Sequence, residues 1–176
     1  MNLKLRKLGT QDYRKTWASM QNVILSKGKE DPDELWLLEH FPVYTLGFGA
    51  SEDHLLSENN IPVVRSDRGG EVTYHGPGQI VAYFLINLRR KKWGPKKFVN
   101  ELEASVIDFL KEYNISSTRQ SGDPGVYVKD KKISSVGLKI KRGFSYHGLS
   151  INIDMDLSPF ENINVCGNEG LKAVSY

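Results

Sequence analysis

The chain has 176 residues, with 24 Lys and Arg, 21 Asp and Glu, a formal net charge of +3 and one cysteine. This length predicts a single domain over residues 1–176, and the near balance of charge excludes nucleic-acid binding that rests on overall charge. A lone cysteine excludes an intrachain disulfide and a cysteine-cluster zinc site. Because no apolar run is long enough for a secretory signal or a membrane span, we expect a cytoplasmic protein that binds no membrane.

Two helices are predicted where apolar residues recur at helical spacing. The first covers residues 13–24, with Thr10 as its N-cap, and ends before Lys27-Gly28. The second covers residues 98–113 and starts downstream of Gly94-Pro95, because proline is accepted in the first turn of a helix and interrupts its interior.

Short runs rich in β-branched, aromatic and aliphatic residues predict the strands. These runs are residues 35–38, 43–46, 62–64, 80–88, 126–128, 133–140 and 146–153. Lys141-Arg-Gly143, between the last two runs, predicts a hairpin connection. The helices and strands do not alternate strictly, so we expect an α+β fold in which helices pack on a mixed sheet.

The most unusual segment is residues 67–79, in which four glycines surround Arg68, Thr73, His75 and Gln79. Glycine lets the backbone approach a ligand closely, and a following strand would hold such a loop rigid. The alternative is two surface turns joined by a short strand. His75 is a candidate general base or hydrogen-bond donor because imidazole titrates near neutral pH; the alternative is a loop-shaping role. A single Arg-Gly-Gly triplet is a weak sign of RNA binding, because such elements occur as repeats.

Cys166 is followed by Gly167, which favours a turn. A cysteine in a turn beside a cation is a candidate nucleophile, since both features favour the thiolate. A backbone N–H beside Gly167 is a candidate donor to an oxyanion. The alternative is a cysteine that serves only as a small buried side chain.

Strand alternation makes predictions for two polar side chains. It places Lys132 on the same face as Val136 and Leu138, where partial burial would disfavour a charged amine, unless a bulge changes the register. It places His147 with the apolar face that carries Leu149, which predicts a buried, hydrogen-bonded histidine.

Five segments occur in the order found in one enzyme family. They are residues 41–47, 67–79, 132–137, 147–157 and Cys166-Gly167. On these segments the chain resembles, from about residue 35 to its C-terminus, the octanoyl-acyl-carrier-protein:protein octanoyltransferases, which are the lipoyl(octanoyl) transferases or lipoate–protein ligase B family. The resemblance implies the fold of the biotin and lipoate ligase catalytic domain. It also implies the first step of endogenous protein lipoylation, in which octanoyl moves from octanoyl-acyl carrier protein to a lysine of a lipoyl domain.

The resemblance also assigns roles to individual residues. Cys166 would form the acyl thioester, and Lys132 would lower the pKa of its thiol and shuttle protons. The acyl pocket would be lined by Arg68, Gly69, Gly70, Glu71, Val72, Thr73, Tyr74, His75, Ser135, Val136, Gly137, Gly148, Leu149 and Ser150. No cofactor and no metal are implied. The implied partners are octanoyl-acyl carrier protein and the lipoyl domains of 2-oxoacid dehydrogenases and of the glycine cleavage H protein.

Two features depart from the family pattern. Val165 stands where the family usually has proline, and the chain ends at Tyr176, whereas family members usually continue through a further C-terminal segment, so the domain is expected to lack that segment. Two rival functions remain open, an ATP-dependent lipoate or biotin ligase and a non-catalytic module that binds an acyl group or its carrier.

The segment 89–97 holds six cations around Trp93. Acyl carrier protein is acidic, so this segment is a candidate docking site for it. The alternative is a solvated turn. A nucleic-acid site on the same segment would show binding that weakens with salt.

Overall fold

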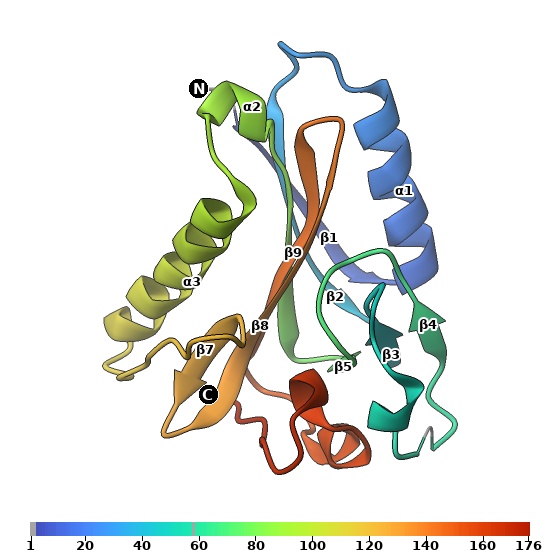
Figure 1. Ribbon diagram of the computed structural model, residues 1–176, viewed down its shortest axis with the longest axis vertical. Coiled ribbons are helices and arrows are strands. Elements are labelled where there is room, and N and C mark those ends of the chain that lie inside the picture. The colour runs from blue at the N-terminus through green and yellow to red at the C-terminus, as the bar shows by residue number, and fades with distance from the viewer. Residues whose placement is uncertain (1–2, 58) are drawn as a thin grey trace.

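The computed structural model describes residues 3–57 and 59–176 and is built around a six-stranded sheet of order β1-β2-β6-β9-β8-β7 (Figure 1). Its strands are β1 (Leu3–Gln11), β2 (Asp33–His40), β6 (Gln79–Leu85), β7 (Gly125–Val128), β8 (Lys131–Lys141) and β9 (Phe144–Asn152). β1 and β2 run parallel and the other neighbours antiparallel, so the sheet is mixed, as expected. A small second sheet has the order β4-β3-β5, from β4 (Val63–Arg65), β3 (Val43–Leu46) and β5 (Thr73–His75).

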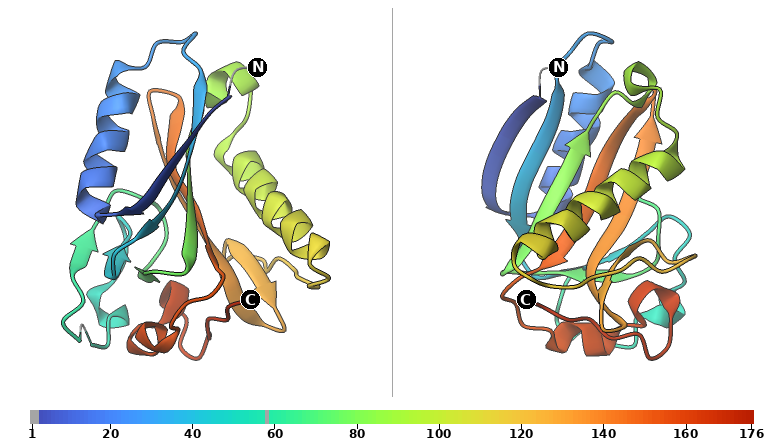
Figure 2. Two further views of the ribbon diagram at one scale, coloured as in Figure 1. Left: turned by 180° about the vertical axis from the view of Figure 1, so that it is seen from behind. Right: turned by 90° about the vertical axis from the view of Figure 1, so that its left-hand side faces the viewer.

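Two helices cover opposite faces of the large sheet, α1 (Tyr13–Ser26) and α3 (Pro95–Glu112) (Figure 2). Met20 of α1 packs in a buried cluster with Trp36 of β2. Phe98 of α3 packs in a second cluster with Leu149 of β9. The α+β prediction is therefore confirmed, and each helix buries the apolar stripe from which it was predicted.

Most predicted elements are present, and the differences lie at element ends. The N-cap of α1 is Asp12, whose side chain accepts the Lys15 N–H at 2.9 Å, and not Thr10, which belongs to β1. The strand expected over residues 80–88 ends at Leu85, because Asn87 caps the short helix α2 (Leu88–Lys91). β1 and β5 were not among the predicted strands; β1 is a largely exposed edge strand and β5 has three residues, so neither carries a strong apolar signal.

A bulge near the start of β8 changes which way its first residues face. Val126 pairs with Ser134 and Tyr127 with Lys132, so Ile133 is an extra residue in β8. Ile133 packs in the cluster that contains α3, as do Val136 and Leu138. The expectation that Lys132 shares their face is therefore wrong, and Lys132 faces the other side of the sheet.

A second irregularity sits in β9. His147 has a φ of +59°, in the left-handed region that non-glycine residues rarely adopt. The turn at this residue brings its ring beside that of Tyr146, with the two centroids 5.1 Å apart. His147 is buried and hydrogen-bonded, as expected. It does not share the face of Leu149, however, which packs towards α3.

Candidate active site

Cys166 lies in a single 3₁₀ turn, Val165–Gly167, and both Cys166 and Gly167 have left-handed φ angles, of +56° and +72°. The turn is closed by the Gly167 N–H, which donates to the Asn164 carbonyl at 2.9 Å. The Gly167 N–H is therefore used within the turn. Val165 is buried in the cluster that contains Leu46, so this side chain anchors the turn.

Lys132 reaches Cys166 from the start of β8. Its Nζ lies 2.5 Å from the Cys166 Sγ and 2.6 Å from Oδ1 of Asp123, and its side chain is only 2% exposed. The lysine stem passes over Gly125, where an added Cβ would lie 2.5 Å from the Lys132 Cε. The two residues predicted as the catalytic pair are thus in contact, although they stand 34 positions apart in the chain.

Asp123 completes this arrangement, and the sequence contains no signal for it. Asp123-Pro-Gly125 is typical of a surface turn. Only the pairing of β7 with β8 brings its carboxylate beside Lys132. We call Cys166, Lys132 and Asp123 the charged cluster.

The pKa of the Cys166 thiol reflects opposing effects. Burial raises it, the Lys132 ammonium lowers it, and Asp123 raises it, so that the pKa stands above its ordinary value. Lys132 therefore favours the thiolate, as the family resemblance implies, but in this structure it does not outweigh burial and Asp123 together.

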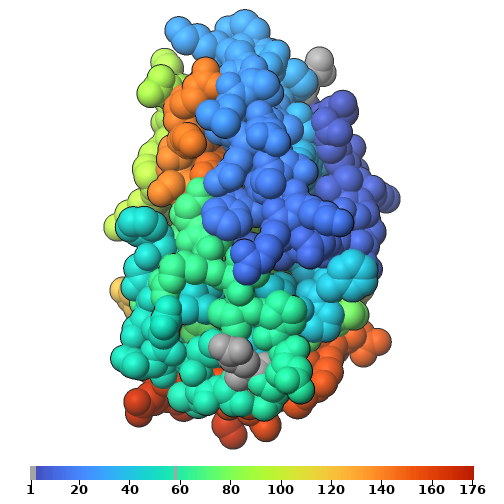
Figure 3. Space-filling model, turned by 90° about the vertical axis from the view of Figure 1, so that its right-hand side faces the viewer, coloured from blue at the N-terminus to red at the C-terminus, as the bar shows by residue number. Residues whose placement is uncertain are grey.

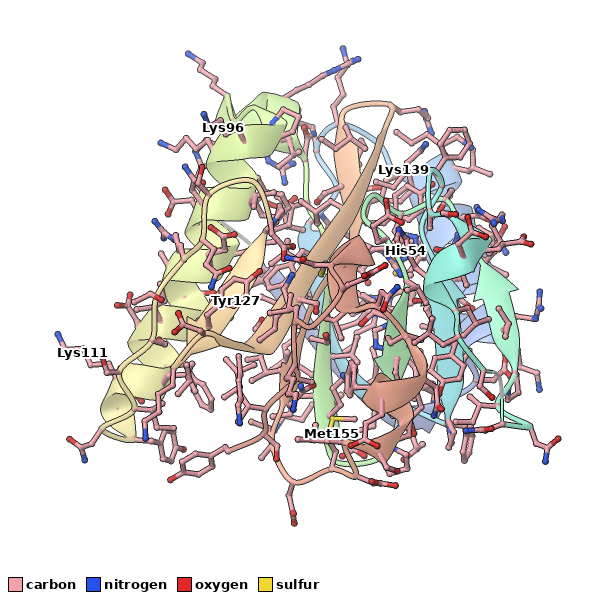
Figure 4. The ribbon with its side chains drawn as sticks, turned by 60° about the horizontal axis from the view of Figure 1, so that its bottom comes forward. His54, Lys96, Lys111, Tyr127, Lys139 and Met155 are labelled. Carbon is pink, nitrogen blue, oxygen red and sulfur yellow. The ribbon has the colours of Figure 1, made fainter. Side chains whose placement is uncertain are left out.

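The C-terminal segment fixes the backbone of Lys132. The Lys132 N–H donates to the Lys172 carbonyl at 2.9 Å, and the Val174 N–H donates to the Lys132 carbonyl at 3.0 Å. Figure 4 looks towards this end of the molecule, with Tyr127 and His54 on either side of the turn that carries Cys166. The turn and the lysine are thus held from several separate segments.

A pocket opens beside Cys166 between the glycine-rich segment and the middle of β8 and β9. Most of the predicted lining residues line it, namely Arg68, Gly70, Glu71, Val72, Thr73, His75, Ser135, Val136, Gly137, Gly148, Leu149 and Ser150. Gly69 and Tyr74 do not; the Gly69 N–H donates to the Leu138 carbonyl, and the Tyr74 ring packs on Phe160. Tyr13, Val81, Tyr83 and His147 also line the pocket and were not predicted to do so.

Arg68 holds the glycine-rich loop together. Its guanidinium donates to the carbonyls of Thr45 at 2.6 Å, Glu71 at 2.8 Å and Gly69 at 2.9 Å. Gly47 allows the loop to come close, because a Cβ there would lie 2.8 Å from the Gly70 carbonyl carbon. The guanidinium thus joins the loop to β3, and Arg68 shapes the pocket wall.

His75 is held as a neutral ring. Its Nδ1–H donates to the Gln79 Oε1 at 2.7 Å, and the Gln79 amide in turn donates to the Asn152 Oδ1 at 2.9 Å. Burial lowers the pKa of His75 to about 3. Gln79 therefore selects one tautomer of His75, and the uncharged ring is suited to lining an acyl site.

The ring of His40 lies next to that of His75, and Tyr13 contacts the rings of His40, His75 and His147. His40 and His147 are also held by fixed partners. Burial lowers the pKa of His40 to about 4, and its Nε2 lies 2.7 Å from the Tyr83 hydroxyl. Burial also lowers the pKa of His147, against the opposing effect of Asp67, whose Oδ1 is 3.0 Å from the His147 Nε2. We call His40, His75 and His147 the histidine cluster; Tyr13, which contacts all three rings, is the first residue of α1. Figure 3 shows the face of the molecule on which α1 (blue) lies next to the segments of the small sheet (teal to green).

Asp67 ties this cluster to α1. It accepts from the Trp17 indole at 2.9 Å and from the Gln21 amide at 3.2 Å, as well as from the Tyr146 hydroxyl. Burial raises the pKa of Asp67. The hydrogen bonds from His147 and Tyr146 lower it and together outweigh burial, so the carboxyl titrates well below its usual range. Asp67 is therefore a carboxylate that fixes helix, strand and histidine together.

The segment 89–97 lies at the opposite end of the molecule from Cys166 (Figure 1). The backbone N–H of Leu88, the residue just before this segment, donates to the Gly143 carbonyl in the turn between β8 and β9. Lys132 lies at the other end of β8, which has eleven residues. A strand of this length spans about 30 Å. A carrier docked on segment 89–97 would have to reach along the whole sheet, so its position gives no support to docking there.

No helix within residues 3–57 and 59–176 is long and apolar enough to cross a membrane.

Structures with the same fold are lipoate and biotin ligases. A lipoate-protein ligase A bound with ATP aligns with a TM-score of 0.76 at 15% identity, over 97% of this chain and 78% of that one. A bi-partite lipoate protein ligase from Thermoplasma acidophilum gives a TM-score of 0.73 at 18% identity, over 93% of this chain and 66% of that one. The biotin protein ligase of Aquifex aeolicus gives 0.54 at 14% identity, over 99% and 57%. At these identities the similarity concerns the fold.

Closer relatives are named octanoyltransferases. That of Vibrio atlanticus (strain LGP32) is 54% identical over 170 residues, which are 97% of this chain and 78% of the relative. That of Shewanella amazonensis (strain ATCC BAA-1098 / SB2B) is 48% identical over 172 residues, or 98% and 80%. The profile of the lipoyl protein ligase A/B catalytic domain matches residues 12–174. The chain therefore belongs to the lipoyl protein ligase A/B catalytic-domain family and, within it, to the octanoyltransferases, which are acyltransferases.

Proposed function

We propose that this chain transfers an octanoyl group from the thioester of octanoyl-acyl carrier protein to a lysine of a lipoyl domain, through a thioester on Cys166. The acceptors would be the lipoyl domains of 2-oxoacid dehydrogenases and the glycine cleavage H protein. The observation that carries the proposal is the contact of the Lys132 Nζ with the Cys166 Sγ beside the pocket formed by the family's segments.

In the first half-reaction the Cys166 sulfur attacks the thioester carbonyl of the donor. A new C–S bond forms and the C–S bond to the carrier breaks. The Lys132 ammonium donates a proton to the departing carrier thiolate, and the amine so formed takes up the proton that the Cys166 thiol loses. One thioester replaces another, so the bond energy changes little. Lys132 lies 2.5 Å from the sulfur and is placed to stabilise negative charge there.

In the second half-reaction the neutral amine of the acceptor lysine attacks the Cys166 thioester. A C–N bond forms and the C–S bond breaks, while the Lys132 ammonium stabilises the departing Cys166 thiolate. The nitrogen of the new amide loses one proton, and the thiolate takes up one proton to become the thiol again. An acceptor that arrives as an ammonium releases one proton overall. The conversion of a thioester to an amide is downhill, which drives the transfer.

Part of the pocket wall is uncharged and suits an acyl chain. Val72, Val136 and Leu149 supply apolar surface, and His75 and His147 are neutral rings at neutral pH. Each buried methylene contributes about 0.8 kcal/mol. Chain-length preference would therefore follow from how many methylenes the pocket covers.

The test is the intact mass of the protein after incubation with octanoyl-acyl carrier protein. We expect one hydroxylamine-labile octanoyl adduct on the wild type and none on Cys166→Ala, since the chain has one cysteine. Absence of the adduct on the wild type contradicts the proposal. Acylation of a lipoyl domain only when ATP is added would then favour a ligase, and carrier binding without transfer would favour a binding module.

A further inference from the structure

Asp123 contacts the charged nitrogen of Lys132 at a place where water has little access. Its Oδ1 lies 2.6 Å from the Lys132 Nζ, and the side chains are 24% and 2% exposed. A buried ammonium is costly unless an anion compensates it. The carboxylate therefore provides the counter-charge that allows Lys132 to stand against Cys166.

The backbone around Asp123 is braced from two sides. The Asp123 carbonyl accepts the Tyr127 hydroxyl at 3.1 Å. Two residues on, the Gly125 N–H donates at 2.9 Å to Oε1 of Glu103, a buried residue of α3. Glu103 also pairs with Arg119. Such bracing is what a side chain needs in order to hold another at a fixed distance.

The other carboxylate oxygen of Asp123, Oδ2, takes no part in holding Lys132. Within the described part of the chain, Oδ2 is buried and has no hydrogen-bond partner. A carboxylate that served only as a structural ion pair would be expected to satisfy both of its oxygens. Instead, the ammonium of Lys132 is the bonded group, and it contacts both the carboxylate and the Cys166 sulfur.

We propose that Asp123 is a positioning residue, which holds the Lys132 ammonium against the Cys166 sulfur and sets how readily that sulfur ionises. The inference deepens the proposed acyl transfer and rests on it. One ammonium is shared between two anionic groups, the carboxylate and the developing thiolate. Loss of the carboxylate leaves the thiolate as the remaining neighbouring counter-charge of Lys132.

Two opposite effects follow. Without the negative charge of Asp123 the Cys166 thiolate forms more easily, because a like charge has been removed. At the same time the ammonium is no longer held in one orientation, so proton delivery to the leaving group becomes slower. The other titratable groups around the cluster are Tyr127 of β7, Glu103 of α3, Glu71 of the glycine-rich segment and His54 of the 3₁₀ turn at Glu52–His54.

The experiment measures two rates on the full chain. The first is alkylation of Cys166 by iodoacetamide as a function of pH, and the second is octanoyl transfer to a lipoyl domain. In Asp123→Asn we expect the apparent pKa of Cys166 to fall by about one unit and transfer to fall roughly tenfold. Asp123→Glu should restore part of both values.

Asp130→Asn is the matched control, since Asp130 is an exposed acidic residue at the turn between β7 and β8. Neither its alkylation profile nor its transfer rate should change. Asp123→Ser serves as a second neutral variant should Asp123→Asn fail to fold, as judged by urea unfolding.

Coincident alkylation profiles for the wild type and Asp123→Asn would overturn the inference, as would faster alkylation with undiminished transfer. A wild type that forms no octanoyl adduct would instead overturn the proposed function. The alkylation profiles would then still decide whether Asp123 controls Cys166.

Discussion

The charged cluster and the histidine cluster are built by opposite physical means, although both adjoin one pocket. Cys166, Lys132 and Asp123 meet as a thiol, an ammonium and a carboxylate, whose charges depend on one another. The rings of His40 and His75 are uncharged, because burial lowers their pKa values to about 4 and about 3. The comparison teaches that burial by itself does not make a reactive site: Cys166 has an ammonium beside it, whereas His40 and His75 are held by the uncharged side chains of Tyr83 and Gln79.

The largest effect is expected from removing the cation of the charged cluster. Lys132→Met keeps the length of the side chain and should reduce octanoyl transfer roughly a thousandfold, because proton transfer by a positioned group contributes about 10²–10⁴. Alkylation of Cys166 at neutral pH should also slow, since the ammonium that favours the thiolate is gone. Lys131→Met, an exposed neighbour on β8, should transfer at the wild-type rate. Equal transfer rates for Lys132→Met and Lys131→Met would show that the charged cluster does not carry the reaction.

A smaller effect is expected from moving the cation without removing it. In Gly125→Ala the new Cβ would lie 2.5 Å from the Lys132 Cε and closer still to the Ser134 carbonyl oxygen of β8, so the ammonium and the local pairing of β7 with β8 must both shift. We expect transfer to fall up to about a hundredfold, the cost of a misplacement of roughly 1 Å. The measurement is kcat and KM with the carrier substrate.

Gly122→Ala controls for backbone strain in that experiment. Gly122 also has a left-handed φ, of +86°, but no atom lies within 4 Å of its added Cβ. Transfer should then be close to wild type. A comparable loss in both variants would mean that strain, and not the displaced lysine, caused the effect.

The histidine cluster should affect the free energy of unfolding and not the rate of octanoyl transfer. The pKa of His75 is lower in the folded protein, about 3, than in the unfolded chain, about 6.5, so the unfolded state binds protons first as the pH falls. The free energy of unfolding should therefore decrease below about pH 6.5, by up to about 1.4 kcal/mol per pH unit for this residue. Urea unfolding at several pH values measures this slope.

His75→Gln removes that titration and should flatten the slope, with a lower stability at neutral pH. His54→Gln provides the comparison, because His54 lies outside the buried cluster in a short 3₁₀ turn. Its slope should match the wild type. If the slope in His75→Gln equals that of the wild type, protonation of this ring does not destabilise the folded protein.

The smallest effect is expected far from both clusters. Charge reversal at Lys92 and Lys96, in the segment at the opposite end of the sheet, should change the KM for octanoyl-acyl carrier protein by less than about twofold. A much larger increase would show that the carrier does dock on segment 89–97.

Much of the fold follows from local pattern. The helix over residues 98–113 and the strand Val43–Leu46 lie where their apolar spacing predicts them, and Arg142 and Gly143 form the expected hairpin turn with left-handed φ angles. These features depend on neighbours in the chain, through side-chain periodicity and turn geometry. The edge strand β1 was missed because its side chains are mostly exposed and its pairing with β2 is not local.

The predictions from side-chain alternation along a strand were wrong at two positions beside the pocket. A bulge at Ile133 turned Lys132 to the other face, and the left-handed backbone of His147 turned its ring away from Leu149. Both residues are nevertheless buried, as expected. Irregular backbone of this kind is stabilised by the surrounding structure, and it occurs where a side chain must be aimed at a site.

The sequence by itself determined the family, through segments such as 67–79, and it singled out Cys166 and Lys132 as separate candidates. Tertiary structure alone decided that these two side chains meet, that Asp123 stands behind Lys132 and that His147 borders the pocket. The physical reason is distance along the chain. Residue types and their spacing express local preferences, whereas the position of the Lys132 charge relative to Cys166 depends on how two segments 34 residues apart pack together.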